Sequence, residues 1–360
     1  MKARLTCLSG IGGKGPACFL VEAEGLRLML DLGVGPTPGE FPPVDGVGKV
    51  DALLLSHQHG DHIGALSLRP RIGLPTIHAT PPVAQAAALA EADYVPLPLR
   101  GRCEVAGIGV STGRSGHSPG GIWLHLAVGD GLLYCGDISC ESALFPFDPP
   151  PPATTVLLDA SYGIDDVPQS TRAAAVLAEL AAGPVLLPVP AAGRGAEIAL
   201  MLHDAGAPLP RLDAKVRTAI AALAKGDGMV TPSVAVRLAR IAENAPEAGP
   251  AEGVTLASDA NAMDGMAREL ALAWAEAPNG PAILFTGYIP PGTLADQLIR
   301  EGRARWMRWN VHPTLSDNRR LVRATGARRV IPAFGPAKYL DDWKTAFAPA
   351  EVTLQKVVEL

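Results

Sequence analysis

The stretch that decides the fold is DALLLSHQHGDH, residues 51–62. Its apolar first half predicts a short buried strand, and the polar second half predicts a loop at the strand's end. That loop carries four side chains that bind metals: His57, His59, Asp61 and His62. The two histidines that are two residues apart can point at one ion from an extended turn, and the aspartate and last histidine can turn toward a second. Such donors suit zinc, and also iron or manganese.

A chance group of histidines on a polar surface loop is the alternative interpretation. Further donors along the chain argue against it. His117 lies in SGHSPGG, residues 115–121, and Asp137 follows an apolar run in LLYCGDIS, residues 132–139. Asp31 similarly follows an apolar run in MLDLG. Each is a weak signal alone, because an aspartate after a strand is usually a turn or cap residue, but their order together favours a metal site.

These segments resemble the metallo-β-lactamase superfamily of metallohydrolases. Asp31 matches the first motif of the superfamily, and residues 57–62 match its histidine-rich motif. The resemblance implies an α/β fold, specifically an αββα sandwich, and two zinc ions with manganese or iron as alternatives. It also implies one ion held by three histidines, a second held by an aspartate and a histidine, and one bridging aspartate. The first ion would be held by His57, His59 and His117. The second would be held by Asp61 and His62, and Asp137 would bridge the two ions.

The middle of the chain alternates short strands with alanine-rich helices, which predicts an α/β layer with a parallel sheet. Four of its segments resemble the nucleic-acid-processing branch of the superfamily, which carries an inserted β-CASP domain and includes ribonuclease J and the endonuclease of pre-mRNA 3′-end processing. The segments are LLDASYG (157–163), VLLPVPAAGRGAEIAL (185–200), ILFTGYIPPGT (283–293) and WNVHPTLSD (309–317). We therefore predict a metallo-β-lactamase domain of residues 1–163 and 306–360, and a β-CASP-like inserted α/β domain of residues 164–305.

This resemblance implies metal-dependent hydrolysis of phosphodiester bonds in RNA or single-stranded DNA. Asp61 would also orient the attacking water. Asp159 would hold a ligand histidine in one tautomer, although an aspartate at a strand end can simply accept backbone N–H bonds. His312 is the candidate general acid or phosphate contact, and the alternative is a packing histidine beside Trp306 and Trp309.

One position departs from the pattern of the branch. The third β-CASP motif is a His-Gly after an apolar strand, and its histidine binds the second metal ion. Here the strand expected at residues 329–332 leads to Phe334, and phenylalanine cannot coordinate a metal. We therefore expect a weak second metal site. Some DNA-processing members also lack this histidine, so catalysis is not excluded.

Four arginines are candidate substrate contacts: Arg194, Arg319, Arg320 and Arg323. The first lies between two glycines at an expected helix start, where backbone N–H groups favour a phosphate; a solvated arginine is the alternative. The other three lie in residues 300–329, which contain nine arginines and only two acids. Such a segment fits a nucleic-acid backbone and predicts salt-sensitive binding, but charge runs are also common on solvated faces.

The glycine-rich stretch SGIGGKGP, residues 9–16, resembles a phosphate-binding loop only superficially. It lacks the Ser or Thr that follows the lysine of such loops, here Lys14, and it lacks their full glycine spacing. We predict a turn between the first two strands.

The chain as a whole is acidic, with 31 Lys and Arg against 36 Asp and Glu. This balance argues against a uniformly basic nucleic-acid-binding protein. The five scattered cysteines contain no CxxC pair, and no apolar signal segment is evident, so we expect a cytoplasmic protein with reduced thiols. No stretch approaches the roughly 20 apolar residues of a membrane span, so no membrane partner is expected. The sequence is compatible with a homodimer.

Two other functions are compatible with the sequence. The hydrolase core equally supports hydrolysis of a small ester, lactone or phosphodiester, and the salt dependence of polynucleotide binding would separate that function from a nuclease. Phe334 also fits a non-catalytic nucleic-acid-binding subunit. The complete donor set argues against such a subunit, because inactive members of the branch commonly lose these ligands. A metal content near zero would support it.

Overall fold

The computed structural model describes residues 3–249, 252–277 and 280–360. These residues form two compact units. The first unit contains the described residues of 1–140, 147–166 and 312–360, and the second those of 141–146 and 167–311. The boundaries of an inserted domain at residues 163/164 and 305/306 stay a prediction.

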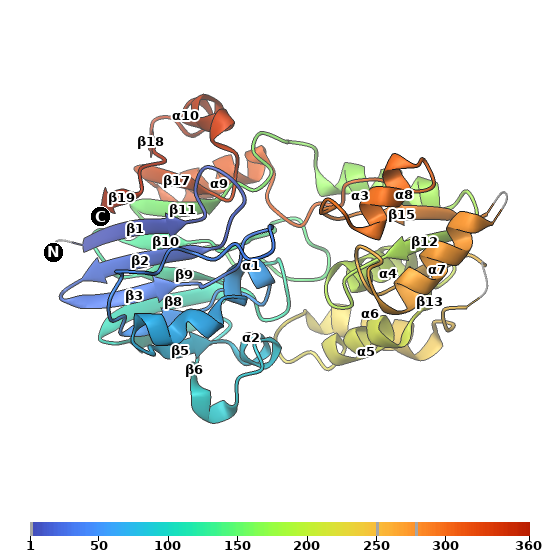
Figure 1. The fold of residues 1–360 in the computed structure, drawn as a ribbon, viewed down its shortest axis with the longest axis horizontal. Coiled ribbons are helices and arrows are strands. Elements are labelled where there is room, and N and C mark those ends of the chain that lie inside the picture. The colour runs from blue at the N-terminus through green and yellow to red at the C-terminus, as the bar shows by residue number, and fades with distance from the viewer. Residues whose placement is uncertain (1–2, 250–251, 278–279) are drawn as a thin grey trace. The chain divides into compact units, whose positions relative to one another are not determined.

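Two seven-stranded sheets form the described part of the first unit (Figure 1). One sheet has the order β19-β1-β2-β3-β4-β5-β6, with bounds, in that order, Val357–Glu359, Ala3–Ser9, Cys18–Ala23, Leu26–Leu30, Ala52–Leu54, Thr76–Ala79 and Tyr94–Pro96. The other has the order β18-β17-β11-β10-β9-β8-β7, with bounds Glu351–Val352, Arg329–Ala333, Thr155–Asp159, Leu132–Tyr134, Ile122–Leu126, Ile108–Arg114 and Gly101–Val105. Strands β3 to β6 pair in parallel, as do β10, β11, β17 and β18, and the remaining neighbours pair antiparallel.

The two sheets share one apolar core. Side chains alternate along each strand with a period of two. In β3, Leu28 and Leu30 therefore enter the shared core, where they join Leu124 of β9. Met29 points to the other face and packs with Val83. The last three residues of this strand are buried on both faces of the sheet, which explains why all three are apolar.

Helices cover the outer faces of both sheets. The first sheet packs against α1 (Gly60–Ile63), α2 (Pro81–Ala86) and the 3-10 helix η1 (Leu66–Ile72). The second sheet packs against α9 (Leu315–Thr325) and α10 (Leu340–Phe347), whose Trp343 is fully buried. Two further 3-10 turns are η2 (Glu91–Asp93) and η3 (Ala337–Tyr339). These layers confirm the predicted αββα sandwich.

The second unit has a five-stranded sheet within the described residues, and all of its strands are parallel (Figure 1). Its order is β13-β14-β12-β15-β16, with bounds Arg211–Leu212, Val254–Ala257, Val185–Pro188, Ala282–Phe285 and Arg305–Trp306. Six α-helices accompany it in the described ranges: α3 (Gln169–Leu180), α4 (Arg194–Asp204), α5 (Ala214–Leu223), α6 (Pro232–Asn244), α7 (Gly265–Glu276) and α8 (Leu294–Arg300).

Two apolar clusters in this unit lie on opposite faces of its sheet. Along β12, Val185 and Leu187 pack with α3 to α6, while Leu186 packs with α7 and α8. A parallel sheet covered on both faces is the layer that the alternating sequence predicts. Across the described ranges of both units, no helix has the length and apolar character needed to cross a membrane.

Candidate metal centre

The predicted metal ligands meet in the first unit, at loops that follow strands. His57 and His59 lie in the loop after β4, and Asp61 and His62 lie in α1, which that loop enters. The third predicted histidine, His117, comes from the loop between β8 and β9, and Asp137 follows β10. The fold brings these side chains close together, although they come from three segments that are far apart in the sequence.

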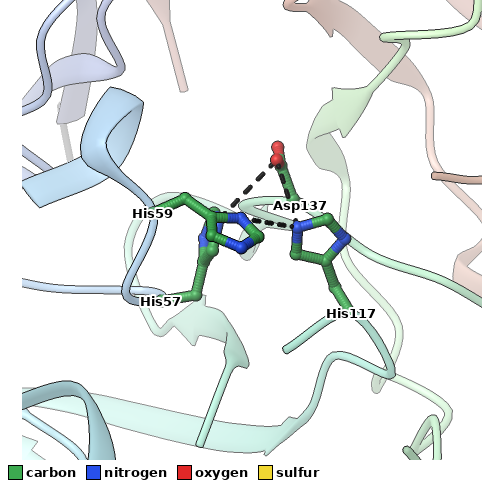
Figure 2. A group of neighbouring side chains, drawn as sticks. All are labelled: His57, His59, His117 and Asp137. Atoms are coloured by element: carbon green, nitrogen blue, oxygen red, sulfur yellow. Dashed lines mark hydrogen bonds and ion pairs between the residues drawn. The ribbon is translucent and has the colours of Figure 1, made fainter. Parts of the chain in front are cut away.

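The first donor group consists of His57, His59, His117 and Asp137, whose side chains converge in Figure 2. His59 Nδ1 lies 3.1 Å from His57 Nε2 and 3.0 Å from His117 Nε2. Asp137 Oδ2 lies 3.6 Å from each of those two Nε2 atoms. Donors that surround a tetrahedral zinc ion at about 2.05 Å are separated from one another by roughly 3.3 Å. The donor set and its spacing therefore fit one such ion.

The state of His57 also suits a metal ligand. Its ring is fully buried, and this burial, together with the neighbouring His62, lowers its pKa well below the ordinary value. A low pKa keeps the imidazole neutral, which is the form that binds metals. His57 Nδ1 lies 3.1 Å from Ser56 Oγ, so the opposite nitrogen faces the other donors. His59 is exposed and gives the group a side that solvent reaches.

The second donor group consists of Asp61, His62 and Asp137. His62 Nε2 lies 3.3 Å from Asp137 Oδ1. Burial disfavours a charged His62, but the carboxylates of Asp137 and Asp31 outweigh burial and raise its pKa. These carboxylates therefore favour a positive charge at this position. Phe334 borders the group instead of a fourth donor, with its ring centroid 5.1 Å from that of His62.

Asp31 orients His62 by binding its Nδ1, the ring nitrogen opposite to the one that faces Asp137. It lies directly after β3 with φ 58° and is fully buried. Its Oδ2 accepts a hydrogen bond from His62 Nδ1 at 2.7 Å and others from the hydroxyls of Ser56 and Tyr134, while its Oδ1 accepts from the Ser56 backbone N–H. A carboxylate on one ring nitrogen fixes the tautomer and leaves the other nitrogen free to bind a metal.

Gly33 allows the histidine-rich loop to approach the strand end. A Cβ atom at this glycine would lie 1.7 Å from the backbone oxygen of Asp61. No side chain fits in that space. The backbone around it is also tied down, because Leu32 N–H donates to the His62 oxygen at 2.8 Å.

A third group joins His312 and Asp159 to Asp137. His312 Nδ1 lies 2.9 Å from Asp159 Oδ2, at the end of β11, and 3.8 Å from Asp137 Oδ2. Burial disfavours a charged His312, but the two carboxylates outweigh burial and raise its pKa, which favours the protonated ring. Its ring lies 4.9 Å from that of His117 and 5.1 Å from that of Tyr162. The histidine is therefore beside the first donor group.

Asp159 has two sets of contacts. Besides His312, it accepts hydrogen bonds from the backbone N–H of Ile138 and from both the N–H and hydroxyl of Ser161. Both interpretations of this aspartate are therefore visible: it accepts backbone bonds at a strand end and it contacts a histidine. Its partner is His312, and not a histidine of the first donor group.

The predicted substrate contacts are distributed over both units. Arg194 is the first residue of α4 in the second unit, and its guanidinium lies where a side chain at Gly287 would be. The other three belong to the first unit and lie exposed on α9: Arg319, Arg320 and Arg323. Arg320 forms an ion pair with Asp317 in the first turn of that helix.

One charged residue near the donor groups was not predicted from the sequence. Lys14, in the loop between β1 and β2, has its Nζ 3.3 Å from Asp61 Oδ2. The prediction of a turn at residues 9–16 agrees with the loop observed there. The sequence did not predict that the lysine of this turn contacts Asp61 of the second donor group. Only a charged residue among glycines gave any hint of it. The roles of Ser56 and Tyr134 as partners of Asp31 had no signal in the sequence.

Known proteins are similar to this chain in sequence or in fold. Residues 11–99 match the family described as Metallo-beta-lactamase superfamily. Transcription termination factor FttA of Cenarchaeum symbiosum is 27% identical over 250 residues, which cover 55% of this chain and 38% of that protein. The RNase J-like protein of Methanocaldococcus jannaschii is 29% identical over 222 residues, covering 53% of this chain and 52% of its own. Endoribonuclease ysh1 of Schizosaccharomyces pombe is 26% identical over 353 residues, which cover 80% of this chain and 46% of that protein.

A solved structure, titled as a protein of unknown function from Enterococcus faecalis V583, matches the fold with a TM-score of 0.60. The two chains are 13% identical, and the match covers 100% of each. The family match over residues 11–99 and these relatives support the resemblance to the metallo-β-lactamase superfamily and its β-CASP branch that the motifs predicted. The chain spans between 38% and 52% of the length of those curated relatives.

Proposed function

We propose that this protein is a metal-dependent nuclease that hydrolyses phosphodiester bonds. One observation supports the proposal above others: the first donor group lies beside the pair of His312 and Asp159. A metal ion that stabilises the phosphoryl charge and a group that protonates the leaving oxygen together favour hydrolysis of a phosphodiester. The two are adjacent here, because Asp137 belongs to both.

The metal ion would be held by His57, His59, His117 and Asp137. When bound, such an ion polarises phosphoryl oxygens and promotes the deprotonation of water. Zinc is proposed because the donors are three imidazoles and a carboxylate at tetrahedral spacing; manganese and iron accept the same donor types. Asp61 is half-buried in the neighbouring second donor group, and its carboxylate would orient the attacking water.

His312 would donate a proton to the leaving oxygen. Its Nδ1 is engaged by Asp159, so its other ring nitrogen is the one that would face the substrate. The same carboxylate stabilises the protonated ring and fixes its orientation. Asp159 is thus proposed to act on the reaction through His312.

RNA is the favoured polymer, and single-stranded DNA is the second choice. Support comes from relatives whose names describe an RNase J-like protein and an endoribonuclease. The phosphate backbone would be contacted by the four arginines Arg194, Arg319, Arg320 and Arg323. The three exposed arginines on α9 offer planar donors that suit phosphate oxygens.

The test is cleavage of 5′-labelled single-stranded RNA and DNA by the zinc- or manganese-loaded chain. Asp137→Ala removes a donor that all three groups share, and Asp341→Ala, at an exposed position on α10, is the matched control. We expect the wild type and the control to cleave and Asp137→Ala to be inactive. The product ladder separates exonuclease from endonuclease action. If neither polymer is cleaved by metal-loaded protein, the nuclease proposal is wrong and small esters become the substrates to test.

A further inference from the structure

Lys14 lies in a loop whose backbone is anchored on both sides, and its side chain is 42% exposed. The loop between β1 and β2 is bonded through its backbone to two other parts of the site. On one side, Ala17 N–H donates to the Asp61 oxygen at 2.8 Å. On the other, Gly10 oxygen accepts from Phe334 N–H at 2.8 Å. These bonds hold the two ends of the loop that carries Lys14 beside Asp61 and Phe334, which border the second donor group.

The ammonium of Lys14 lies in an acidic environment. Its Nζ is 3.3 Å from Asp61 Oδ2, and the carboxylates of Asp137 and Asp159 also attract it. Asp61 is therefore already paired with a cation that belongs to the chain. A divalent ion on the same carboxylate would be repelled by that cation at short range.

Phe334 leaves the second donor group with three donors. Its buried ring packs between His62 and Phe19, with centroid distances of 5.1 and 6.0 Å. Its φ of 63° is an uncommon backbone conformation for a bulky residue, and one in which histidine is enriched. The backbone here would accept a ligand side chain, but the side chain present is apolar.

We propose that the Lys14 ammonium takes the place of a second metal ion, so that the protein binds one metal ion per chain, in the first donor group. The cation would balance Asp61 and Asp137 and would offer N–H donors to a phosphate oxygen of the substrate. A lysine provides such a point charge without the geometric demands of a coordinated ion. The inference rests on the metal centre of the proposed function and does not depend on which polymer is cleaved.

Zinc stoichiometry of the full chain tests this proposal, measured by native mass spectrometry and by elemental analysis after dialysis. The variants are Lys14→Met, Lys14→Arg, and the double variant Lys14→Met/Phe334→His. Lys344→Met is the matched control, because Lys344 is exposed on α10 and pairs with Asp341 outside the site. We expect one zinc ion in the wild type, in the control and in Lys14→Arg, which keeps the charge.

Removal of the charge should open the second group to metal. We expect Lys14→Met to bind a second zinc ion at least about tenfold more tightly than the control does, and the double variant to retain two ions through dialysis. If the double variant does not fold, the comparison of Lys14→Met with Lys14→Arg decides alone. Two tightly bound ions in the wild type, or equal second-ion binding by Lys14→Met and the control, would overturn the proposal.

The two proposals fail in different ways. A wild type that retains one zinc ion but cleaves no polymer contradicts the nuclease function and leaves the role of Lys14 standing. A wild type that binds no zinc contradicts the metal centre itself, and both proposals then fall. Cleavage by a wild type that retains two ions removes only the inference about Lys14.

Discussion

Two aspartates at strand ends show how position decides the role of a residue. Asp31 is fully buried, and donors from His62, Ser56 and Tyr134 surround it. Asp137 faces the histidines and belongs to every donor group found among the described residues. The first carboxylate orients a ligand, and the second is available to metal and proton chemistry.

His312→Ala tests the proton donor at this scale. We expect the variant to lose about 10²–10⁴-fold in kcat/KM on RNA, which is the range that general acids contribute. A phosphodiester with an activated leaving group, such as bis(p-nitrophenyl) phosphate, needs no proton on the departing oxygen. On that substrate the variant should stay within a fewfold of the wild type. Equal losses on both substrates would contradict a general acid and indicate a role in binding or folding.

At the scale of elements, the ends of strands carry most of the chemistry and the contacts that hold loops in place. The end of β8 is an example. Arg114 donates two side-chain hydrogen bonds to Asp148, at 2.8 and 2.9 Å, and Trp123 Nε1 donates to the Asp148 backbone oxygen. This bidentate pair attaches the segment before β11 to the sheet. Its hydrogen bonds also lower the pKa of Asp148, because Arg114 stabilises the carboxylate.

Arg114→Met should therefore destabilise the fold in a pH-dependent way. A carboxyl whose folded pKa is lowered stabilises the protein above its unfolded pKa, and this contribution is lost as the pH falls through the folded value. At pH 7 we expect the free energy of unfolding to fall by about 2 kcal/mol. The difference should shrink below about pH 4, where the unfolded carboxyl is protonated.

Thermal unfolding of metal-free protein from pH 7 to pH 3 measures this difference. Arg4→Met is the control, because Arg4 pairs with Glu22 at an exposed position and surface pairs contribute little. A difference between Arg114→Met and the wild type that stays constant across the whole pH range would show that Asp148 titration is not its source.

At the scale of the molecule, the arginine-rich stretch 300–329 is less basic than its composition indicates. Its arginines belong to two units, and acids from elsewhere pair with several of them: Arg300 with Asp296, Arg305 with Glu179, Arg328 with Asp130 and Arg329 with Glu351. Ion pairs within the fold neutralise part of the excess that the sequence shows. The exposed arginines of α9 are the part most suited to phosphate.

Substitution of all three by glutamine, Arg319→Gln/Arg320→Gln/Arg323→Gln, should weaken RNA binding and its salt dependence. Each phosphate contact on a single strand contributes about 0.7 to the slope of log K against log salt. Arg320 already pairs with Asp317, so two to three contacts predict a decrease of about 1.5–2. Fluorescence anisotropy with single-stranded RNA between 50 and 200 mM salt measures the slope. Arg328→Gln, at an arginine paired with Asp130, should leave it nearly unchanged. An unaltered slope in the triple variant would remove α9 from the substrate path.

Local sequence pattern predicts the position of a residue where neighbours in the chain are also neighbours in space. The loop at residues 57–62 follows a buried strand, so its sequence predicts that its donors lie close together, and they do. Phe334 could be recognised because it follows β17 directly. Lys14 could not, because its meaning depends on Asp61, which the backbone of a distant loop brings within 3.3 Å. The pairing of arginines is likewise a property of tertiary packing.

The order of strands in the second sheet also determines how long β11 waits for its partner strand during translation. β11 joins β10 on one side and β17 on the other, but residues 160–328 lie between these two partners in the chain. At about 5–20 residues per second, a ribosome leaves the outer edge of β11 without its partner for on the order of 10–30 s. An open strand edge is a template for aggregation. The nascent protein therefore carries its metal-binding loop early, while the edge of β11 needs protection until β17 has been synthesised.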